Sequence, residues 1–151
     1  MSDLYETDIS QWSEQQAELL RRMAAGERVN DQVDWLNVAE EIEDLAARNK
    51  DQIESRLSVL CEHLLKWRFQ PEMQSGSWRG SIVEARDRIA RVIKKNPGLA
   101  NYPAAVLADA YSPGQRKAEA ETGLRDLPAV CPWTIDQVLD HGFLPEDAAP
   151  A

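Results

Sequence analysis

Apolar residues recur along most of the chain in steps of three and four, the spacing of helices that bury one face. Over residues 8–25 this spacing predicts a first helix, which a glycine ends. A second run continues from Trp35 to Trp67 without an internal proline or glycine. It predicts one long helix over residues 35–69, with Asp34 as its N-cap. Such a helix would be roughly 50 Å long.

The core face of this long helix is expected to follow the inward positions of a helical wheel. These positions hold a row of apolar side chains: Ile42, Ala46, Ile53, Leu60 and Trp67. At the start of the helix, Val33 and Val38 have the spacing of a hydrophobic staple across the N-cap. The pattern therefore predicts burial along the length of the helix.

Proline and glycine divide the second half of the chain into shorter elements. The segment "QPEMQSGSW", residues 70–78, is predicted to be a loop. A third helix follows, with Ser77 as its expected N-cap, and it ends at "NPG", residues 96–98.

A fourth helix is predicted to begin near Tyr102 and to break at "SPG". There Ser112 is expected to cap, and Pro113 to open, a further helix that ends near residue 122. A short helix over residues 134–140 precedes the C-terminal tail.

The chain shows no strand-like alternation of useful length, so the predicted fold is an all-α helical bundle organised along the long second helix. Its 151 residues suit one domain with its own core. We expect a single helical domain over residues 1–151, with a core at about 5–145 and a flexible C-terminal tail.

Charge is distributed unevenly along this acidic chain, whose formal net charge is −9. Residues 1–65 hold 15 acidic and 6 basic residues, whereas residues 66–95 hold 3 acidic and 8 basic ones. The expected explanation is a basic third helix packed beside acidic ones, because charge runs are usually solvated surface. Nucleic acid is not an expected partner, since the net charge repels phosphates, and weak binding through the third helix is an alternative.

Cysteine usage and the chain ends indicate a cytoplasmic protein. Cys61 and Cys131 lie far apart without metal-ligand spacing, which suits two reduced thiols and predicts neither a metal site nor a cofactor. A disulfide between them is an alternative that no feature of the sequence supports. The first residues, "MSDLYETDIS", do not resemble a secretory signal. No apolar run is long enough to span a membrane.

Polar residues spaced by seven form a seam on the edge of the apolar face of the second helix: Asn49, Arg56 and His63. A buried charge requires a partner, so a buried Arg56 is expected to pair with a carboxylate, for which Asp8 is one candidate. The seam is expected to fix helix register. The alternative is a catalytic or metal-dependent site that uses Glu41, Arg56 and His63, Glu41 being the carboxylate of "EEIEDL" nearest the seam.

The junction of the second and third helices gathers aromatic and basic residues, and we expect it to be the partner-binding corner. Its candidate ligand- or partner-binding residues are Lys66, Trp67, Ser77, Trp78, Arg79 and Arg86. Backbone donors of a helix that begins at Ser77 would favour an anion or a carboxylate. We expect Glu72 or an acidic residue of the first helix to occupy this corner, because the chain has many carboxylates.

Several motifs together resemble the bacterial family known as domain of unknown function 29. They are "DWLNVAEEIEDL", "ESRLSVLCEHLLKWRFQPE", "SWRGSIVEARDRI" and "CPWTIDQVLDHGFLP", and they cover about residues 5–145. The resemblance implies an all-helical fold and no established activity. It also implies that the family pattern falls on Asp8, Trp12, Trp35, Glu40, Glu41, Glu43, Arg56, His63, Lys66, Trp67, Gln70, Ser77, Trp78 and Arg86.

The function expected from these patterns is that of a non-enzymatic protein-interaction or regulatory domain. Its partner would be an unidentified protein, and self-association into a homo-oligomer is compatible with the sequence. No phosphate loop, dinucleotide fingerprint or nucleophile elbow points to a reaction.

Overall fold

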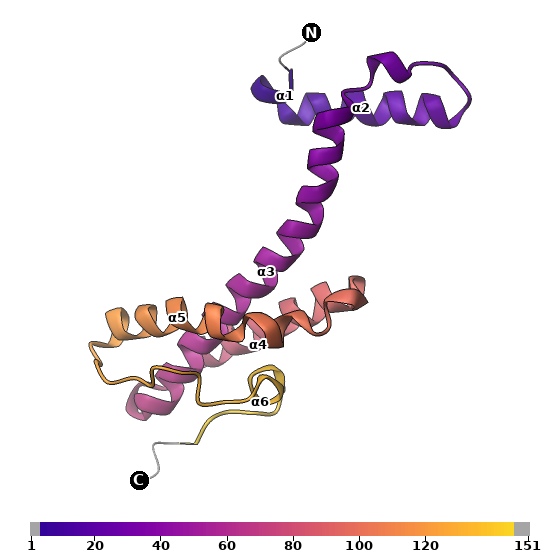
Figure 1. Cartoon of the computed structure of the whole chain (residues 1–151). Coiled ribbons are helices and arrows are strands. Elements are labelled where there is room, and N and C mark those ends of the chain that lie inside the picture. Colours follow the sequence, from indigo (N-terminus) through magenta and orange to yellow (C-terminus); the bar gives the residue numbers. More distant parts are fainter. Residues whose placement is uncertain (1–3, 147–151) are drawn as a thin grey trace. The chain divides into compact units, whose positions relative to one another are not determined.

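Helices make up the fold in the computed structural model, which describes residues 4–146 and contains no β-strand in that range (Figure 1). The all-α prediction is therefore confirmed. The described residues divide into two compact units, one up to Ala47 and one from Arg48, and the long helix α3 contributes residues to each. No helix within residues 4–146 has the length and apolar character needed to cross a lipid bilayer. The predicted single domain stays a prediction, and the predicted flexible tail lies outside the described residues from position 147 onward.

The N-terminal unit contains α1 (Leu4–Thr7), α2 (Ile9–Ala24), the 3-10 helix η1 (Asn30–Gln32) and the first turns of α3. Asp8 is the N-cap of α2 and accepts a hydrogen bond from the Gln11 backbone N–H at 3.0 Å. The connection after α2 folds back so that a small apolar cluster forms from Leu19, Leu20, Met23, Val29, Val33 and Val38.

Polar contacts hold the beginning of α3 to α2. Trp12 is buried, and its indole N–H donates to Oδ2 of Asp34 at 3.1 Å. The side-chain oxygen of buried Gln16 accepts from the Asp34 backbone N–H at 2.8 Å. The amide of Asn37, which donates to the same carboxylate, is the main cause of the lowered pKa of Asp34. Asp34 therefore joins the two helices in addition to preceding α3.

Helix α3 spans Trp35–Phe69, as the unbroken apolar spacing predicts. Its buried positions, however, begin only at Ile53. Ile42 is 62% exposed, and Ala46 is exposed as well, so the predicted burial of these two residues is wrong. The reason is that the apolar side chains of α2 pack on the connection after it, through Val29 and other residues of the small cluster, rather than along α3.

The C-terminal unit surrounds the second half of α3 with α4 (Gly76–Lys95), α5 (Tyr102–Thr122) and α6 (Ile135–Leu139), joined in part by 3-10 turns at Pro71–Met73 and Pro97–Leu99 (Figure 1). Its main core combines side chains from all four helices: Ile53, Leu57, Leu60, Leu64, Ile82, Ala85, Ile89, Val92, Val106, Ala110 and Val138. These positions repeat at helical spacing, so each helix contributes one apolar face.

Helix α5 is continuous from Tyr102 to Thr122, so the predicted break at Pro113 is wrong. Proline removes one backbone donor and ordinarily kinks a helix. Here the residues on either side of it, Ala110 and Gly114, are buried on the face that packs against α3, whereas Pro113 is exposed. Packing of the residues before and after the proline against α3 thus keeps α5 continuous.

Helix α4 begins two residues earlier than its sequence suggests. Ser75, and not the predicted Ser77, is its N-cap, and the Ser75 hydroxyl accepts from the Trp78 backbone N–H at 3.2 Å. The segment "SGS" offers two serines two positions apart, and Gly76 between them adopts helical geometry.

Replacing Ser75 with alanine is expected to lower the free energy of unfolding by about 1 kcal/mol, because one backbone donor of the first turn loses its acceptor. Ser77→Ala provides the matched control and should change it by less than about 0.5 kcal/mol. Urea titrations followed by circular dichroism would measure both. A larger effect of Ser77→Ala would contradict the assignment of the cap.

Candidate functional site

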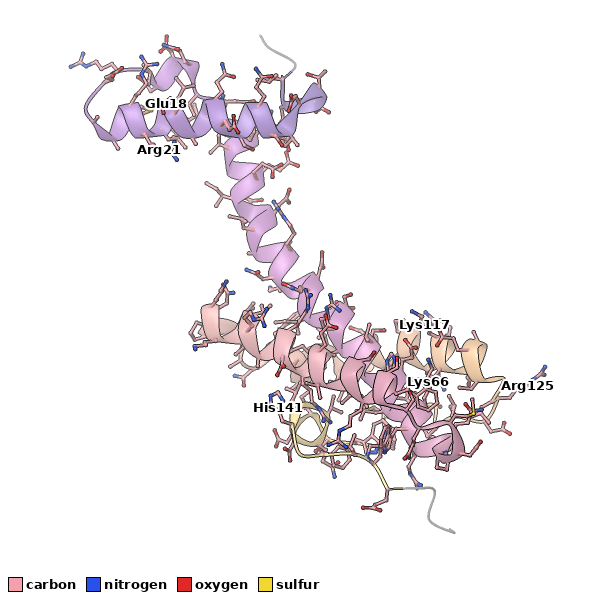
Figure 2. All side chains as sticks on the ribbon, turned by 180° about the vertical axis from the view of Figure 1, so that it is seen from behind. Glu18, Arg21, Lys66, Lys117, Arg125 and His141 are labelled. Atoms are coloured by element: carbon pink, nitrogen blue, oxygen red, sulfur yellow. The ribbon has the colours of Figure 1, made fainter. Side chains whose placement is uncertain are left out.

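The junction of α3, α4 and α5 contains a buried ion-pair cluster. Lys66 is 5% exposed, and its Nζ lies 2.8 Å from Oε2 of Glu62, which is 2% exposed. Lys66 also pairs with the carboxylate of Glu121 on α5, and its Nζ lies 5.7 Å from the centroid of the Trp78 ring. Lys117, whose side chain is 62% exposed, approaches Glu62 at 3.8 Å. The side chains of Lys66 and Lys117 are labelled in Figure 2. Two carboxylates therefore neutralise the lysine of the predicted corner.

The hydrogen bond from Lys66 lowers the pKa of the Glu121 carboxyl group, against the opposing effect of desolvation. The carboxylates that pair with Lys66 are Glu62 and Glu121, and not the predicted Glu72 or a residue of the first helix. Glu62 and Lys66 are four apart on one helix, a spacing that is readable from sequence. The pairing of Lys66 with Glu121 could not be predicted from helical spacing, because the two residues are 55 positions apart in the sequence.

The other candidate residues of the corner differ in burial. Trp67 packs against the main core, and Trp78 is partly buried beside Lys66. Ser77 and Arg79 are exposed in the first turns of α4. The structure thus joins Lys66 and Trp78 but leaves Ser77 and Arg79 at the surface.

Arg86 is buried, and its contacts connect α4 to α6. Its Nε donates to the Val138 carbonyl oxygen at 2.8 Å, and one terminal nitrogen lies 3.5 Å from the Gln137 carbonyl oxygen. Carbonyl groups at a helix C-terminus lack partners within the helix and carry partial negative charge. Desolvation lowers the pKa of Arg86, while Asp140 acts in the opposite direction. Arg86 therefore stabilises the end of α6.

Asn49 and His63 of the predicted polar seam make separate contacts with different partners. The Asn49 side chain lies 3.5 Å from that of Asn96, and Nδ1 of partly buried His63 lies 2.8 Å from the Val59 carbonyl oxygen of its own helix. Within residues 4–146, Arg56 forms no ion pair with a carboxylate, so the predicted partner is not found there.

Glu41 lies in the N-terminal unit, whereas Arg56 and His63 belong to the C-terminal unit. Its Oε1 accepts a hydrogen bond from the Tyr5 hydroxyl at 2.8 Å, and this bond raises the pKa of Tyr5 to about 12. Across residues 4–146, no three histidine, cysteine or acidic side chains are grouped as a metal ion requires.

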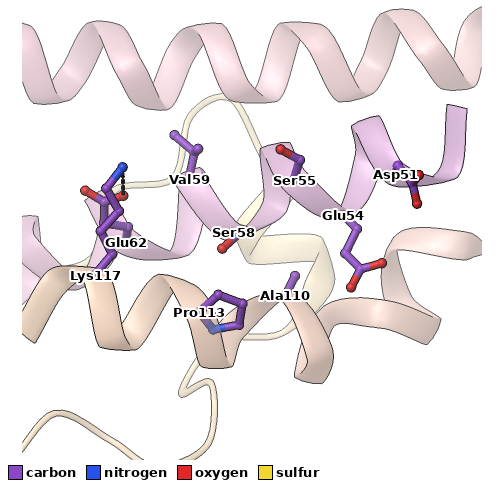
Figure 3. A pocket seen from close by; sticks show the side chains of 9 residues that line it. All are labelled: Asp51, Glu54, Ser55, Ser58, Val59, Glu62, Ala110, Pro113 and Lys117. Carbon is purple, nitrogen blue, oxygen red and sulfur yellow. Dashed lines mark ion pairs between the residues drawn. The ribbon is translucent and has the colours of Figure 1, made fainter. Parts of the chain in front are cut away.

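An open groove of about 480 Å³ runs between α3 and α5 (Figure 3). Acidic and hydroxyl side chains line it together with one cation: Asp51, Glu54, Ser55, Ser58, Glu62 and Lys117, with Val59, Ala110 and Pro113. Figure 3 shows the ion pair between Glu62 and Lys117 at one end of the groove.

The basic residues of α4 are accompanied by carboxylates. Arg88 pairs with Glu84 at 3.2 Å, and His141 approaches Asp87 at 3.7 Å. The shallow surface that holds Arg79, Arg88 and Arg91 also contains Glu84 and Asp87. Interspersed carboxylates weaken attraction to phosphates, which favours the expected low affinity for nucleic acid.

The first turns of α3 expose an apolar stripe that the sequence pattern had placed in the core. We call Trp35, Ile42 and Leu45 the α3 stripe, and they are 49%, 62% and 57% exposed. Their spacing of seven and three places them on one face of the helix. Glu41 and Glu43 occupy the two edges of that face. Large apolar residues grouped in this way on a surface commonly mark an interaction site.

The unit that carries the α3 stripe also carries the net charge of the protein. Residues 1–47 contain 12 acidic and 3 basic residues, whereas residues 48–151 contain 14 of each. This uneven distribution of charge follows the boundary between the two units, which lies after Ala47. The sequence alone does not indicate that boundary. The α3 stripe is thus set in a strongly acidic surface.

A pocket of about 370 Å³ lies at the beginning of the α3 stripe, within the N-terminal unit. Trp12, Trp35 and Leu36 contribute apolar surface, and Leu36 is 86% exposed. Asp31 and Asp34 also line the pocket. It combines aromatic walls with acidic side chains, a combination that suits an apolar side chain accompanied by a cation.

Comparison with known proteins identifies the family of this chain. No curated protein and no solved structure matches it. One family model, Domain of unknown function DUF29, matches residues 4–144. The match covers nearly all of the 151 residues and agrees with the motifs in the sequence, and we conclude that the chain belongs to the family Domain of unknown function DUF29.

Proposed function

We propose that this protein is a non-enzymatic interaction domain that binds a basic, amphipathic helical segment of a partner protein through the α3 stripe. The observation that carries the proposal is the exposure of Trp35, Ile42 and Leu45 on one helix face within an acidic unit. An amphipathic helix that lays its apolar face on such a surface is a recurrent mode of recognition.

Charge supports this partner over a second copy of the chain. Residues 1–47 carry nine more negative than positive charges, so two such units repel each other. A partner helix with lysine or arginine beside its apolar face would meet Glu41 and Glu43 at the edges of the α3 stripe. Such flanking charges select partner and orientation in paired helices.

The pocket beside Trp12 and Leu36 gives the partner a place for one anchoring side chain. Interfaces usually depend on a few buried apolar or aromatic anchors surrounded by weaker contacts. In this proposal the α3 stripe supplies a continuous apolar surface, the pocket receives one anchor, and the acidic side chains increase the rate of encounter.

The test uses a fluorescently labelled helical peptide of about 18 leucine and lysine residues, with leucines at the spacing of one helix face. Anisotropy titrations with the full chain at about 0.15 M salt should show saturable binding that weakens as salt increases. The double variant Ile42→Glu, Leu45→Glu should bind at least about tenfold more weakly, because two central apolar contacts are lost.

Substitution by glutamate distinguishes the apolar contribution to peptide binding from the electrostatic one. Each substitution adds negative charge, so purely electrostatic attraction of the lysine peptide would become stronger in the double variant. Val83→Glu in α4 is the matched control, since Val83 is 47% exposed and lies in the other unit. Equal binding by wild type and double variant, or an equal loss in Val83→Glu, would refute the α3 stripe as the binding surface.

Two further measurements identify the occupant. Sedimentation of the protein alone should show a monomer, and a dimer that the double variant dissociates would replace the proposed partner with a second copy. Affinity capture from native lysate with wild-type and double-variant baits should then enrich a protein with a basic amphipathic helix only on the wild-type bait. Enriched proteins that lack such a helix would contradict the proposed chemistry.

A further inference from the structure

The two cysteines, 70 positions apart in sequence, meet in a second apolar cluster of the C-terminal unit. Cys61 faces inward from α3 and is fully buried. Cys131 belongs to the segment between α5 and α6, is partly buried, and packs against the cluster that contains Cys61. Its other buried members are Leu65, Tyr111, Ala118 and Leu127. The fold thus places two free thiols side by side.

Hydrogen bonds from α5 hold the segment that carries Cys131. The Tyr111 hydroxyl donates to the Pro128 carbonyl oxygen at 2.5 Å, and the Gln115 side-chain amide donates to the same oxygen at 2.9 Å. Nearer to the thiol, Sγ of Cys131 lies 3.4 Å from the Trp133 carbonyl oxygen. These contacts fix the approach of Cys131 to Cys61 on a segment without regular secondary structure.

The two thiols differ in their ease of ionisation. The neighbouring Cys61 thiol is the main cause that lowers the pKa of Cys131 to about 7, against desolvation, and the backbone of Trp133 contributes in the same direction. The same interaction with Cys131, followed by burial, raises the pKa of Cys61. The phenol of Tyr111 also faces the pair, and burial keeps it protonated by raising its pKa. Cys131 is therefore the more readily ionised thiol of the pair.

We propose that Cys131 and Cys61 are a peroxide-reactive pair in which Cys131 is the nucleophile and Cys61 is the resolving thiol. The Cys131 thiolate attacks hydrogen peroxide, the O–O bond breaks, and sulfenic acid and hydroxide form. The Cys61 thiol then attacks the sulfenic sulfur, an S–S bond forms as the S–O bond breaks, and water leaves. The two thiols lose two electrons in total, and the peroxide is reduced to water.

The disulfide would join the segment before α6 to the centre of α3. It would close a loop of roughly 70 residues and so restrict the unfolded chain more than the folded one. Oxidation is therefore expected to raise the midpoint of thermal unfolding, and reduction with dithiothreitol to reverse the change. This inference concerns the C-terminal unit and does not depend on the proposed partner of the α3 stripe.

The test treats the full chain with a small molar excess of hydrogen peroxide at pH 7. Intact mass should fall by about 2 Da, the loss of two hydrogens, and digestion should yield one peptide pair linked through Cys61 and Cys131. In Cys61→Ala the sulfenic acid on Cys131 should form more slowly, because the thiol that lowers the pKa of Cys131 is absent, but it should persist without the resolving thiol and be trapped by dimedone. In Cys131→Ser, dimedone should trap nothing at the same dose.

Two measurements keep the result independent of damage to the fold. Circular dichroism confirms that each variant is folded before treatment, and Cys61→Val replaces Cys61→Ala if the latter is not. The rate of oxidation in wild type should increase with pH with a midpoint near 7 and should fall about tenfold or more in urea, where the thiols are separated. An unchanged mass, equal reactivity of the two cysteines, or disulfides only between molecules would each overturn the proposal.

Discussion

Replacing Lys66 with methionine is expected to lower the free energy of unfolding by about 3–5 kcal/mol. Methionine fills a similar volume, but it leaves Glu62, which is 2% exposed, without its partner at 2.8 Å. A buried carboxylate that loses its cation retains the full cost of its desolvation. Urea titration at pH 7 would measure the loss, with an unchanged slope as evidence that both proteins unfold to the same extent.

Two further variants test whether the unpaired Glu62 carboxylate causes the loss of stability. Lys117→Met removes the other cation near Glu62, but Lys117 is 62% exposed and 3.8 Å away, so the expected loss is about 0–1 kcal/mol. Adding Glu62→Leu to Lys66→Met should recover most of the lost stability, because no buried charge remains. A loss below about 1 kcal/mol for Lys66→Met would show that the cluster is hydrated in solution.

The contribution of the cluster should depend on pH in a defined direction. Desolvation lowers the pKa of Lys66, but the hydrogen bonds with Glu121 and Glu62 outweigh it, and the pKa lies above the usual 10.5. The stabilisation is therefore complete below about 10.5 and is lost as pH increases through the raised value. For Glu121, whose pKa lies below the usual 4.5, the stabilisation is lost as pH falls through the lowered value. The stability difference between wild type and Lys66→Met should thus decrease as pH rises through the raised pKa of Lys66.

Replacing Gly114 with alanine is expected to destabilise the protein by about 1–3 kcal/mol, although alanine is the better helix former. A Cβ atom at this position would lie 2.5 Å from the backbone oxygen of Ser58 and 3.2 Å from the backbone nitrogen of Glu62. Both contacts are with the backbone of α3, so the two helices would have to separate. The thermal midpoint and the free energy of unfolding would measure the effect.

Gly80 offers a matched control for this substitution. It lies in the interior of α4, and a Cβ atom there would have no neighbour within 4 Å. Gly80→Ala is therefore expected to stabilise the protein by about 0.5–1 kcal/mol. Opposite signs for the two glycines would identify close packing of α5 on α3 as the cause, whereas stabilisation by both would contradict that close approach.

Local pattern was sufficient to predict most of the secondary structure. The helix over 35–69 was predictable because the apolar spacing between Trp35 and Trp67 is continuous and is interrupted by no proline or glycine. Gly26 could be read as a stop in the same way, and it has a positive φ of 98°. Helix formation depends mainly on neighbours three and four positions apart, so the necessary information is local.

Predictions that depended on the wider environment were less successful. Pro113 would break an isolated helix, but the burial of Ala110 and Gly114 against α3 keeps α5 continuous. Ser75 and Ser77 are equally good caps by type, and the side-chain contact with the Trp78 N–H distinguishes them only in three dimensions. The packing of α5 on α3 and the hydrogen bond of Ser75 decide these two outcomes, and neither can be predicted from residue type alone.

By itself the sequence determined the helices, the acidic character and the family, because these depend on residue type and local spacing. The tertiary structure alone decided which apolar residues are covered: Ile53 is fully buried and Ile42 is 62% exposed, although they lie on the same helix with the same periodicity. It also brought Glu121 to Lys66 and Cys131 to Cys61. The physical reason is that burial and pairing depend on which distant segments pack against a residue, and the periodicity of one helix carries no information about its neighbours.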